Sequence, residues 1–385
     1  MDSASPIALF AGLPRRAVSS AGSALGAMIG GVAGRRAGRL ASIVPTMAWR
    51  YGRRDVRADE LLRCVQAERD ASGAAARGAI DVAVLVHGLL IDESNWTLGT
   101  DRLLDHLPGR FGWQPLMVRY NTGLHISENG DALASLLEQL HDAWGPRLGR
   151  VQLIAHSMGG LDSRSALGAL ERRDASVLDR VERLFMLGSP NQGAELERLG
   201  HAVEVAISMA HKIPVGGVAL WNGPTPEESG RIVSDAIREL RHKAAAELAD
   251  GAATPLRSIG RLVRGRSDGI RDLRHAYLQE REWRLAEQLG DRLFVSTRRP
   301  LPAPPGVRIY AVAGSLWPTR SEEPSRWRND GVVSVASVAN KGGDFDELEL
   351  VERGRFVEIP RMLHHLLANS SRVTDQLERW VVEGA

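Results

Sequence analysis

The chain is poor in several features, and each shortage excludes a class of protein. Only one of its 385 residues, Cys64, is a cysteine, so no disulfide can form within the chain and a cysteine metal site has no second thiolate. No run of 18 apolar residues occurs, which argues against a transmembrane helix. The sequence shows no internal repeat, so a solenoid or a propeller is not expected.

The chain also has little net charge. Its 49 basic and 47 acidic residues give a formal charge of +2, which argues against a nucleic-acid partner. Lysine occurs only at positions 212, 243 and 341, and we attribute the excess of arginine to coding bias. Apolar residues make up 43% of the chain, which is enough for a large core.

Residues 1–78 are rich in alanine, glycine and arginine, and we predict a helical extension with helices at 17–34 and 55–70. The segment 17–34 is weakly apolar and has an arginine pair on either side. The simplest interpretation is a helix of a cytoplasmic protein that packs on the domain or on a partner. Peripheral membrane contact through this segment is one alternative. A twin-arginine export signal is another, although no typical cleavage site follows.

From residue 79 onward, apolar strands alternate with helices. We predict strands at 80–86, 115–120, 151–154 and 181–187, with helices at 96–107, 129–144 and 161–167. After an interruption the pattern resumes with strands at 307–313, 329–333 and 355–359 and a final helix at 371–382. This spacing indicates βαβ units, a parallel sheet, and an active site at the carboxyl ends of its strands.

The interruption covers residues 194–304, where helical stretches are predicted at 195–212, 227–249 and 280–289. We interpret it as a cap inserted into a core formed by residues 79–193 and 305–385, with a separate helical domain as the alternative. Four apolar residues in it could line an acyl site or simply pack in its core: Val203, Val205, Ile207 and Met209.

Residues 155–159 read Ala-His-Ser-Met-Gly, directly after an apolar strand. This is the pattern of a nucleophile elbow, a strained turn in which the residues two before and two after the serine must be small. Ala155 and Gly159 meet that need, and the following helix would point its N-terminal dipole at Ser157. A serine between small residues also occurs in ordinary turns, but the strand before it and the helix after it favour the elbow.

A nucleophilic serine needs a base, and the base needs a carboxylate to orient it. In the order Ser, acid, His, the acid follows the strand after the insertion. Asp330 lies there, in a turn rich in glycine and valine, and it is preferred to Asp344 and Asp346 in a nearby acidic loop.

Two adjacent histidines, His364 and His365, follow the last predicted strand, and either could be the base. Apolar residues follow His364 at helical spacing, which favours His364. These residues are Leu367, Leu377 and Trp380.

Acyl transfer also needs two backbone N–H groups that face the developing oxyanion. We expect one from Met158, the residue after the serine. The other is expected from the loop His87-Gly88-Leu89 after the first core strand, where Gly88 allows close approach and Leu89 supplies the N–H group. His87 itself is expected to be structural.

Together these features resemble the α/β-hydrolase superfamily, and more closely its bacterial lipase and esterase branch. The resemblance covers residues 79–382 and implies an α/β fold with a mostly parallel, doubly wound sheet and a helical cap. It also implies a triad of Ser157, Asp330 and His364, with the N–H groups of Leu89 and Met158 as the oxyanion hole. The matching segments are VLVHGLL (84–90), YNTGLHISENG (120–130), LIAHSMGG (153–160), LGSPNQG (187–193), SDGIRDLRHAYL (267–278), NDGVVSV (329–335) and HHLLANSSRV (364–373).

The chain departs from that pattern in two places. Ala155 replaces the usual first glycine of the elbow, and Ser189-Pro190-Asn191 stands where many relatives have Thr-Pro-His. Residues 1–78 contribute nothing to the resemblance.

The expected activity is hydrolysis of a small-molecule ester or lipid through an acyl-enzyme, without a metal or an organic cofactor. The alternatives are an acyltransferase, a thioesterase, or a binding protein that uses the same fold without catalysis. The sequence sets neither the acyl-chain length nor the oligomeric state.

Overall fold

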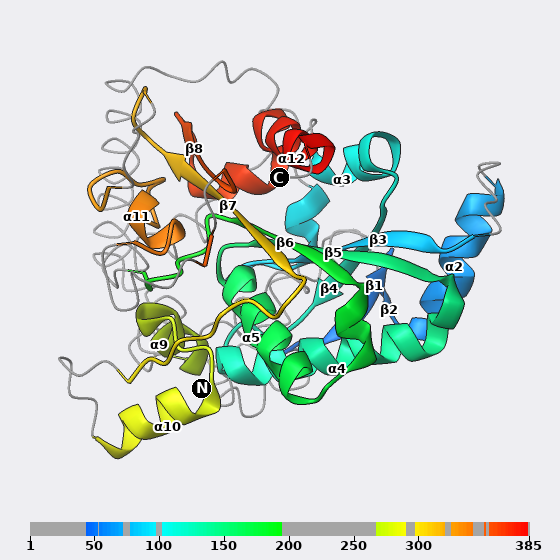
Figure 1. The fold of residues 1–385 in the computed structure, drawn as a ribbon, viewed down its shortest axis with the longest axis horizontal. Coiled ribbons are helices and arrows are strands. Elements are labelled where there is room, and N and C mark those ends of the chain that lie inside the picture. Colours follow the sequence, from blue (N-terminus) through cyan, green and yellow to red (C-terminus); the bar gives the residue numbers. More distant parts are fainter. Residues whose placement is uncertain are drawn as a thin grey trace, which may run out of the picture.

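The computed structural model describes residues 44–52, 54–71, 78–97, 102–194, 267–289, 297–319, 325–341, 350–351 and 354–383. Within these residues one sheet has eight strands, in the order β2-β1-β4-β3-β5-β6-β7-β8 (Figure 1). The strands are β1 (Ala48–Tyr51), β2 (Arg54–Val56), β3 (Ile80–Val86), β4 (Gln114–Arg119), β5 (Leu148–His156), β6 (Val181–Leu187), β7 (Arg308–Ser315) and β8 (Phe356–Pro360).

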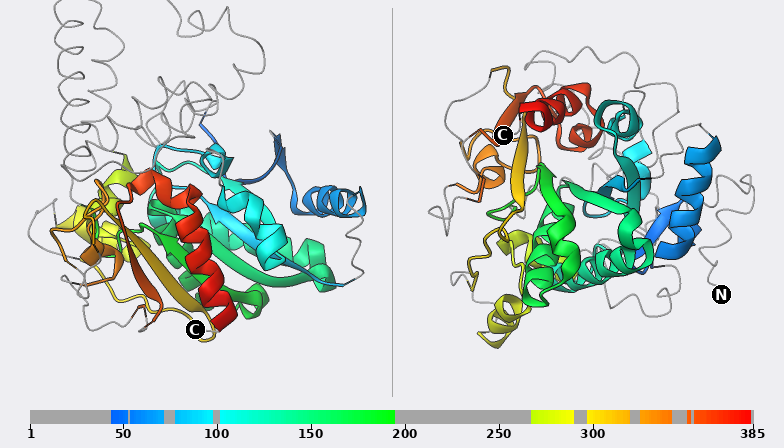
Figure 2. Two further views of the ribbon diagram at one scale, coloured as in Figure 1. Left: turned by 90° about the horizontal axis from the view of Figure 1, so that it is seen from above. Right: turned by 45° about the vertical axis from the view of Figure 1, so that its right-hand side comes forward.

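The six strands β4, β3, β5, β6, β7 and β8 run parallel to one another. Strand β1 is antiparallel to both β2 and β4. Helices cover both faces of the sheet (Figure 1, Figure 2). The helices are α2 (Ala58–Ala71), α3 (Leu103–His106), α4 (Ile126–Trp144), α5 (Met158–Arg172), α9 (Asp268–His275), α10 (Glu280–Gln288), α11 (Val335–Val338) and α12 (Ser371–Glu383).

The central strand β3 shows how the sheet is buried on both sides. Val82, Val84 and Val86 pack in the cluster that contains the apolar residues of α2, α4 and α5. Ala83 and Leu85 face the other way, into the cluster that contains α3 and α12. A strand covered on both faces has no polar side, which is why residues 80–86 read as a nearly continuous apolar run. The prediction of a doubly wound α/β sheet is therefore confirmed.

One predicted strand is wrong. Residues 329–333 form a turn closed by an isolated bridge between Asn329 and Ser334. The Asp330 side chain accepts the N–H groups of Val332 and Val333, so these groups are turned inward and cannot join a sheet ladder.

The sheet begins earlier in the chain than the sequence indicates. Strands β1 and β2 lie inside residues 1–78, where only helices were expected, and β1 pairs with β4 of the core sheet. They are four and three residues long and contain arginines, so they are too short to show a strand period. Helix α2 falls largely within the predicted helix at 55–70, whereas the segment 17–34 lies outside the described residues.

No helix in the described part of the chain is long and apolar enough to cross a membrane. Of the insertion at 194–304, the structure describes Ala194, residues 267–289 and residues 297–304. Helix α10 agrees with the predicted helix at 280–289. The predicted helices at 195–212 and 227–249 lie outside the described residues, as do the four apolar residues named as a possible acyl site, Val203, Val205, Ile207 and Met209.

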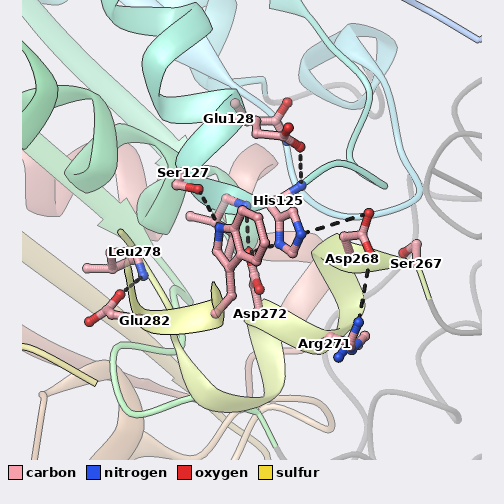
Figure 3. A network of polar contacts seen from close by, with 12 residues as sticks. His125, Ser127, Glu128, Ser267, Asp268, Arg271, Asp272, Leu278 and Glu282 are labelled. Carbon is pink, nitrogen blue, oxygen red and sulfur yellow. Dashed lines mark hydrogen bonds and ion pairs between the residues drawn. The ribbon is translucent and has the colours of Figure 1, made fainter. Parts of the chain in front are cut away.

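The described part of the insertion is attached to the N-terminus of α4 (Figure 3). The His125 ring stacks on Trp283 of α10, with 3.8 Å between ring centroids. His125 Nδ1 lies 3.0 Å from Asp272 Oδ2 of α9, and the Ile126 N–H donates to the same oxygen. The Trp283 indole N–H donates to Ser127 Oγ at 3.0 Å. Each of α9 and α10 therefore has its own polar contact with α4.

Protonation of this attachment depends on pH. Burial lowers the pKa of His125. The hydrogen bond and the charge of Asp272 raise this pKa, as do the charges of Asp268 and Glu128, and together they outweigh burial. Burial raises the pKa of Asp272 to about 6. Both shifts mean that the folded protein holds protons more tightly than the unfolded chain, so the attachment loses stability as pH rises.

We expect His125→Asn to lower the midpoint of thermal unfolding, by more at about pH 6 than at about pH 9. The reason is that the extra stability from His125 is fully present below its unfolded pKa and is lost as pH rises through its raised folded pKa. Calorimetry between these two pH values measures the difference in unfolding midpoint between the variant and wild type. Ser127→Ala is the control, because it removes the Trp283 contact of the same attachment without changing a titratable group, so its difference from wild type should not narrow as pH rises. If the difference in unfolding midpoint between His125→Asn and wild type grows as pH rises, the stabilising role assigned to His125 is wrong.

Helices α4 and α5 meet closely at Gly130. A Cβ added there would lie 2.5 Å from Ser165 Cβ and 2.9 Å from the Ser165 backbone carbonyl carbon. We expect Gly130→Ala to reduce the free energy of unfolding by about 1–3 kcal/mol through overpacking, measured by urea denaturation. Gly109→Ala is the control, because nothing lies within 4 Å of its added Cβ. Equal stability of the two variants would refute the close contact.

Candidate active site

Ser157 lies between the end of β5 and the start of α5, with φ 55° and ψ −125°. A non-glycine residue in such a conformation costs on the order of 1–3 kcal/mol, so its neighbours must hold it there. The Ser157 N–H donates to the Leu187 carbonyl of β6 at 2.8 Å, and the Ser157 carbonyl accepts the Gly160 N–H at 3.1 Å. Sheet and helix thus fix the serine from both sides.

The packing around the turn explains why its neighbours are small. A Cβ on Gly159 would lie 2.5 Å from the His87 carbonyl oxygen and 2.6 Å from that of Val86, at the end of β3. Ala155, two residues before the serine, is fully buried within the sheet. The strand-to-helix turn is therefore the elbow that residues 155–159 predict.

The His364 ring lies between Ser157 and Asp330. His364 follows β8 and begins a short 3-10 helix (His364–Asn369). Its Nε2 is 2.8 Å from Ser157 Oγ, and its Nδ1 is 2.7 Å from Asp330 Oδ2. With Nδ1–H donating to the carboxylate, Nε2 is left as the acceptor for the serine hydroxyl. This tautomer is the one that can remove the hydroxyl proton.

Asp330 is held in place by the turn that replaces the predicted strand. Its Oδ1 accepts the N–H groups of Val332 and Val333 at 3.0 and 2.8 Å, and its backbone carbonyl accepts the His364 N–H at 3.1 Å. The side chain is buried. One carboxyl oxygen is therefore used by the turn, and the other is free to orient the imidazole.

The structure thus brings three predicted residues, Ser157, Asp330 and His364, into one chain of contacts. Among the described residues, no hydrogen bond or ion pair joins the ring of His365 to Ser157 or Asp330. Burial, and then the neighbouring His364, lowers the pKa of His365 to about 4. The other candidate acids, Asp344 and Asp346, lie outside the described residues.

The loop after β3 lies against the serine. A Cβ added to Gly88 would be 2.9 Å from Ser157 Cβ, so a side chain there would displace the serine. Leu89 follows in this loop and is half-buried. Met158 is the first residue of α5, and the first N–H groups of a helix have no acceptor within it. Met158 therefore adjoins Ser157 in the chain, and Leu89 follows the glycine that lies against Ser157 in space.

His156 contributes a contact to which the sequence gave no role. Burial, and then the neighbouring His364, lowers the pKa of His156 to about 3, so its ring is neutral. The neutral ring donates Nε2–H to the His364 carbonyl at 3.0 Å. The only signal in the sequence was its position next to the serine.

The loop Ser189-Pro190-Asn191 contacts two parts of the core, α5 and α11. Asn191 Oδ1 accepts from the buried Arg164 guanidinium of α5 at 3.1 Å, and Asn191 Nδ2 donates to the Val338 carbonyl of α11 at 2.9 Å. Arg164 also donates to the Leu301 carbonyl. Asn191 thus uses both its amide oxygen and its amide N–H in contacts with the core.

The described residues contain no group of three or more His, Cys, Asp or Glu side chains placed to hold a metal ion. The topology is more informative. The mostly parallel sheet has β4 between β1 and β3, and Ser157 follows β5, Asp330 follows β7 and His364 follows β8. The chain has the α/β-hydrolase fold.

Comparison with solved structures finds a lipase, an esterase and an epoxide hydrolase among the matches. The mature form of lipase BlEst2 from Bacillus licheniformis is 16% identical, with a TM-score of 0.43 over 79% of this chain and 92% of that one. An esterase from Pyrobaculum calidifontis is 12% identical, with a TM-score of 0.35 over 80% of this chain and 78% of that one. An epoxide hydrolase from Bacillus megaterium is 13% identical, with a TM-score of 0.36 over 80% and 95%.

These sequence identities and TM-scores are too low to indicate a shared activity. The fold follows instead from the order of the strands in the sheet. Comparison with family models gave no match to the chain. The search of curated proteins gave no match either.

We expect Gly188→Ala to disturb the His364 ring. Gly188 has φ +67°, and its added Cβ would lie 3.0 Å from His364 Nδ1 and Cε1. The proton between His364 Nδ1 and Asp330 gives a downfield NMR signal, which should weaken or move in this variant. Gly306→Ala is the matched control, because it has the same backbone strain at φ +87° but nothing within 4 Å of its Cβ. An unchanged signal in Gly188→Ala would show that the ring is not confined by this contact.

Proposed function

We propose that the protein is a serine carboxyl-ester hydrolase of the esterase or lipase type. The observation that supports this most directly is the chain of contacts from Ser157 Oγ through His364 to Asp330, at 2.8 and 2.7 Å, at a strained elbow. A strained backbone at a residue that contacts a base, when the base is in turn held by an acid, is typical of a catalytic nucleophile.

In the proposed reaction Ser157 Oγ attacks the ester carbonyl while His364 Nε2 takes the hydroxyl proton. Asp330 holds the ring and stabilises the imidazolium. The carbonyl oxygen becomes negative and is bound by the N–H groups of Met158 and Leu89. The alcohol leaves with the proton from His364, which gives an acyl ester on Ser157.

Water then attacks the acyl-enzyme, and His364 Nε2 takes its proton. The carboxylic acid is released, and the proton returns to the Ser157 oxygen. The overall change is one ester and one water converted into one acid and one alcohol. The proposed steps use only protein groups and water, and the substrate is a small-molecule ester or lipid.

The test is hydrolysis of p-nitrophenyl esters of several chain lengths by wild type and Ser157→Ala. We expect wild type to turn over at least part of the panel and Ser157→Ala to lose at least about 10⁴-fold in kcat/KM. His364→Ala should lose a similar amount, whereas His365→Ala, the matched control one residue away, should stay within about threefold of wild type.

Two results would refute the proposal. If wild type hydrolyses none of these esters, the activity is wrong. If Ser157→Ala retains activity, or if His365→Ala is the impaired histidine variant, the assignment of residues is wrong. Analysis of products in the presence of alcohol or thiol acceptors tells hydrolysis from acyl transfer.

A further inference from the structure

The backbone that leads to the proposed oxyanion loop carries a buried hydrogen-bond contact that the reaction itself does not use. Tyr120 directly follows β4, and its hydroxyl oxygen is 2.6 Å from the His87 carbonyl oxygen. The same hydroxyl oxygen is 2.8 Å from Asp162 Oδ2 of α5. All three residues are fully buried.

Counting protons fixes the direction of these bonds. The Tyr120 hydroxyl has one proton, and the His87 carbonyl can only accept. Its proton must therefore point at His87, because two oxygens 2.6 Å apart without a proton between them would repel. The contact with Asp162 then needs a second donor, and a carboxyl group donates only when it is protonated.

The surroundings of Asp162 agree with a neutral carboxyl group. Burial raises its pKa well above the usual range, and the charge of Asp272 adds to the shift. Hydrogen bonding from Tyr120 and Asn129 acts in the opposite direction and lowers this pKa, but burial outweighs it. Burial also raises the pKa of Tyr120 well above its usual value, so the phenol keeps its proton.

Hydrogen bonds hold the turn after β3 at two points, the His87 carbonyl and the Leu90 N–H. The His87 carbonyl precedes Gly88, whose backbone lies against Ser157, and the Leu90 N–H donates to Thr122 Oγ1 at 3.2 Å. Leu89 lies between these two fixed points. Its peptide N–H is the proposed oxyanion donor, and such a donor acts only when it is already aimed at the oxyanion.

We propose that Tyr120 and Asp162 are positioning residues: a neutral Asp162 donates to Tyr120, and Tyr120 donates to the His87 carbonyl, so that the Leu89 N–H is held toward the oxyanion. This inference rests on the proposed ester hydrolysis. Neither residue touches the substrate, and both act through the peptide groups of the loop.

Kinetics of Tyr120→Phe tests the first bond. Phenylalanine keeps the ring that stacks on His87 but removes the donor. We expect kcat to fall about ten- to a hundredfold, with KM within about twofold of wild type, because the loss concerns the transition state. Tyr310→Phe is the matched control: among the described residues its buried hydroxyl has no partner, so kcat should be unchanged. A kcat for Tyr120→Phe equal to that of the control overturns the proposal.

Kinetics of Asp162→Asn tests the second bond. An asparagine amide can donate to Tyr120 as a neutral carboxyl group does, so kcat should stay within about threefold of wild type. A fall in kcat as large as in Tyr120→Phe would show that an amide donor does not replace the Asp162 carboxyl group. That result overturns the proposal, provided that thermal unfolding shows Asp162→Asn to be folded.

Infrared spectroscopy decides the protonation of Asp162 without reference to activity. At pH 8, wild type should show a carboxylic-acid carbonyl band that Asp162→Asn lacks. Absence of this band overturns the neutral donor even in an active enzyme. If wild type hydrolyses no ester at all, the proposed function and the oxyanion role fail together, while the band still reports whether Asp162 donates.

Discussion

The backbone of Ser157 imposes the constraint on which the other parts of the site depend. A residue with a Cβ at φ 55° is held against a cost on the order of 1–3 kcal/mol, and the bond from its N–H to Leu187 is one of the contacts that hold it. The helix that follows must pass so close to β3 that only glycine fits at position 159. The hydroxyl is thereby fixed at the carboxyl edge of the sheet, where the segments after β7 and β8 bring Asp330 and His364.

Burial around this point leaves the neighbouring histidines without charge. Burial lowers the pKa of His87, and it lowers that of His156 to about 3. The His87 ring donates an N–H to the Gly88 carbonyl, and the His156 ring donates an N–H to the His364 carbonyl. An imidazolium that forms on His364 during the proposed reaction therefore meets no positive charge from these two rings. Their role is to fix backbone near the nucleophile.

The parts of this structure that the sequence predicts are those coded locally. The apolar run of residues 80–86 and the small residues around Ser157 appear in short windows, and chain order alone led to Asp330. The sequence distinguishes His364 from His365 less clearly, because adjacent residues share the same local sequence. The geometry of the short helix after β8 decides which ring faces the serine.

The parts that the sequence does not reveal depend on tertiary contacts. Tyr120 meets His87 and Asp162 across 33 and 42 residues, and nothing in the pattern around them signals these bonds. Strands β1 and β2 join the sheet through pairing with β4, although their own sequences are short and polar. Residues 329–333 have strand-like composition, but the Asp330 side chain takes the N–H groups that a strand would use.

The central claim is that Ser157 is an activated nucleophile, and covalent labelling tests it most directly. Wild type is treated with a fluorophosphonate, digested, and examined by mass spectrometry. The account predicts one adduct per chain, on the peptide that contains Ser157, and a labelling rate that falls steeply in His364→Ala. Failure to label, or an adduct on a different serine, would contradict it.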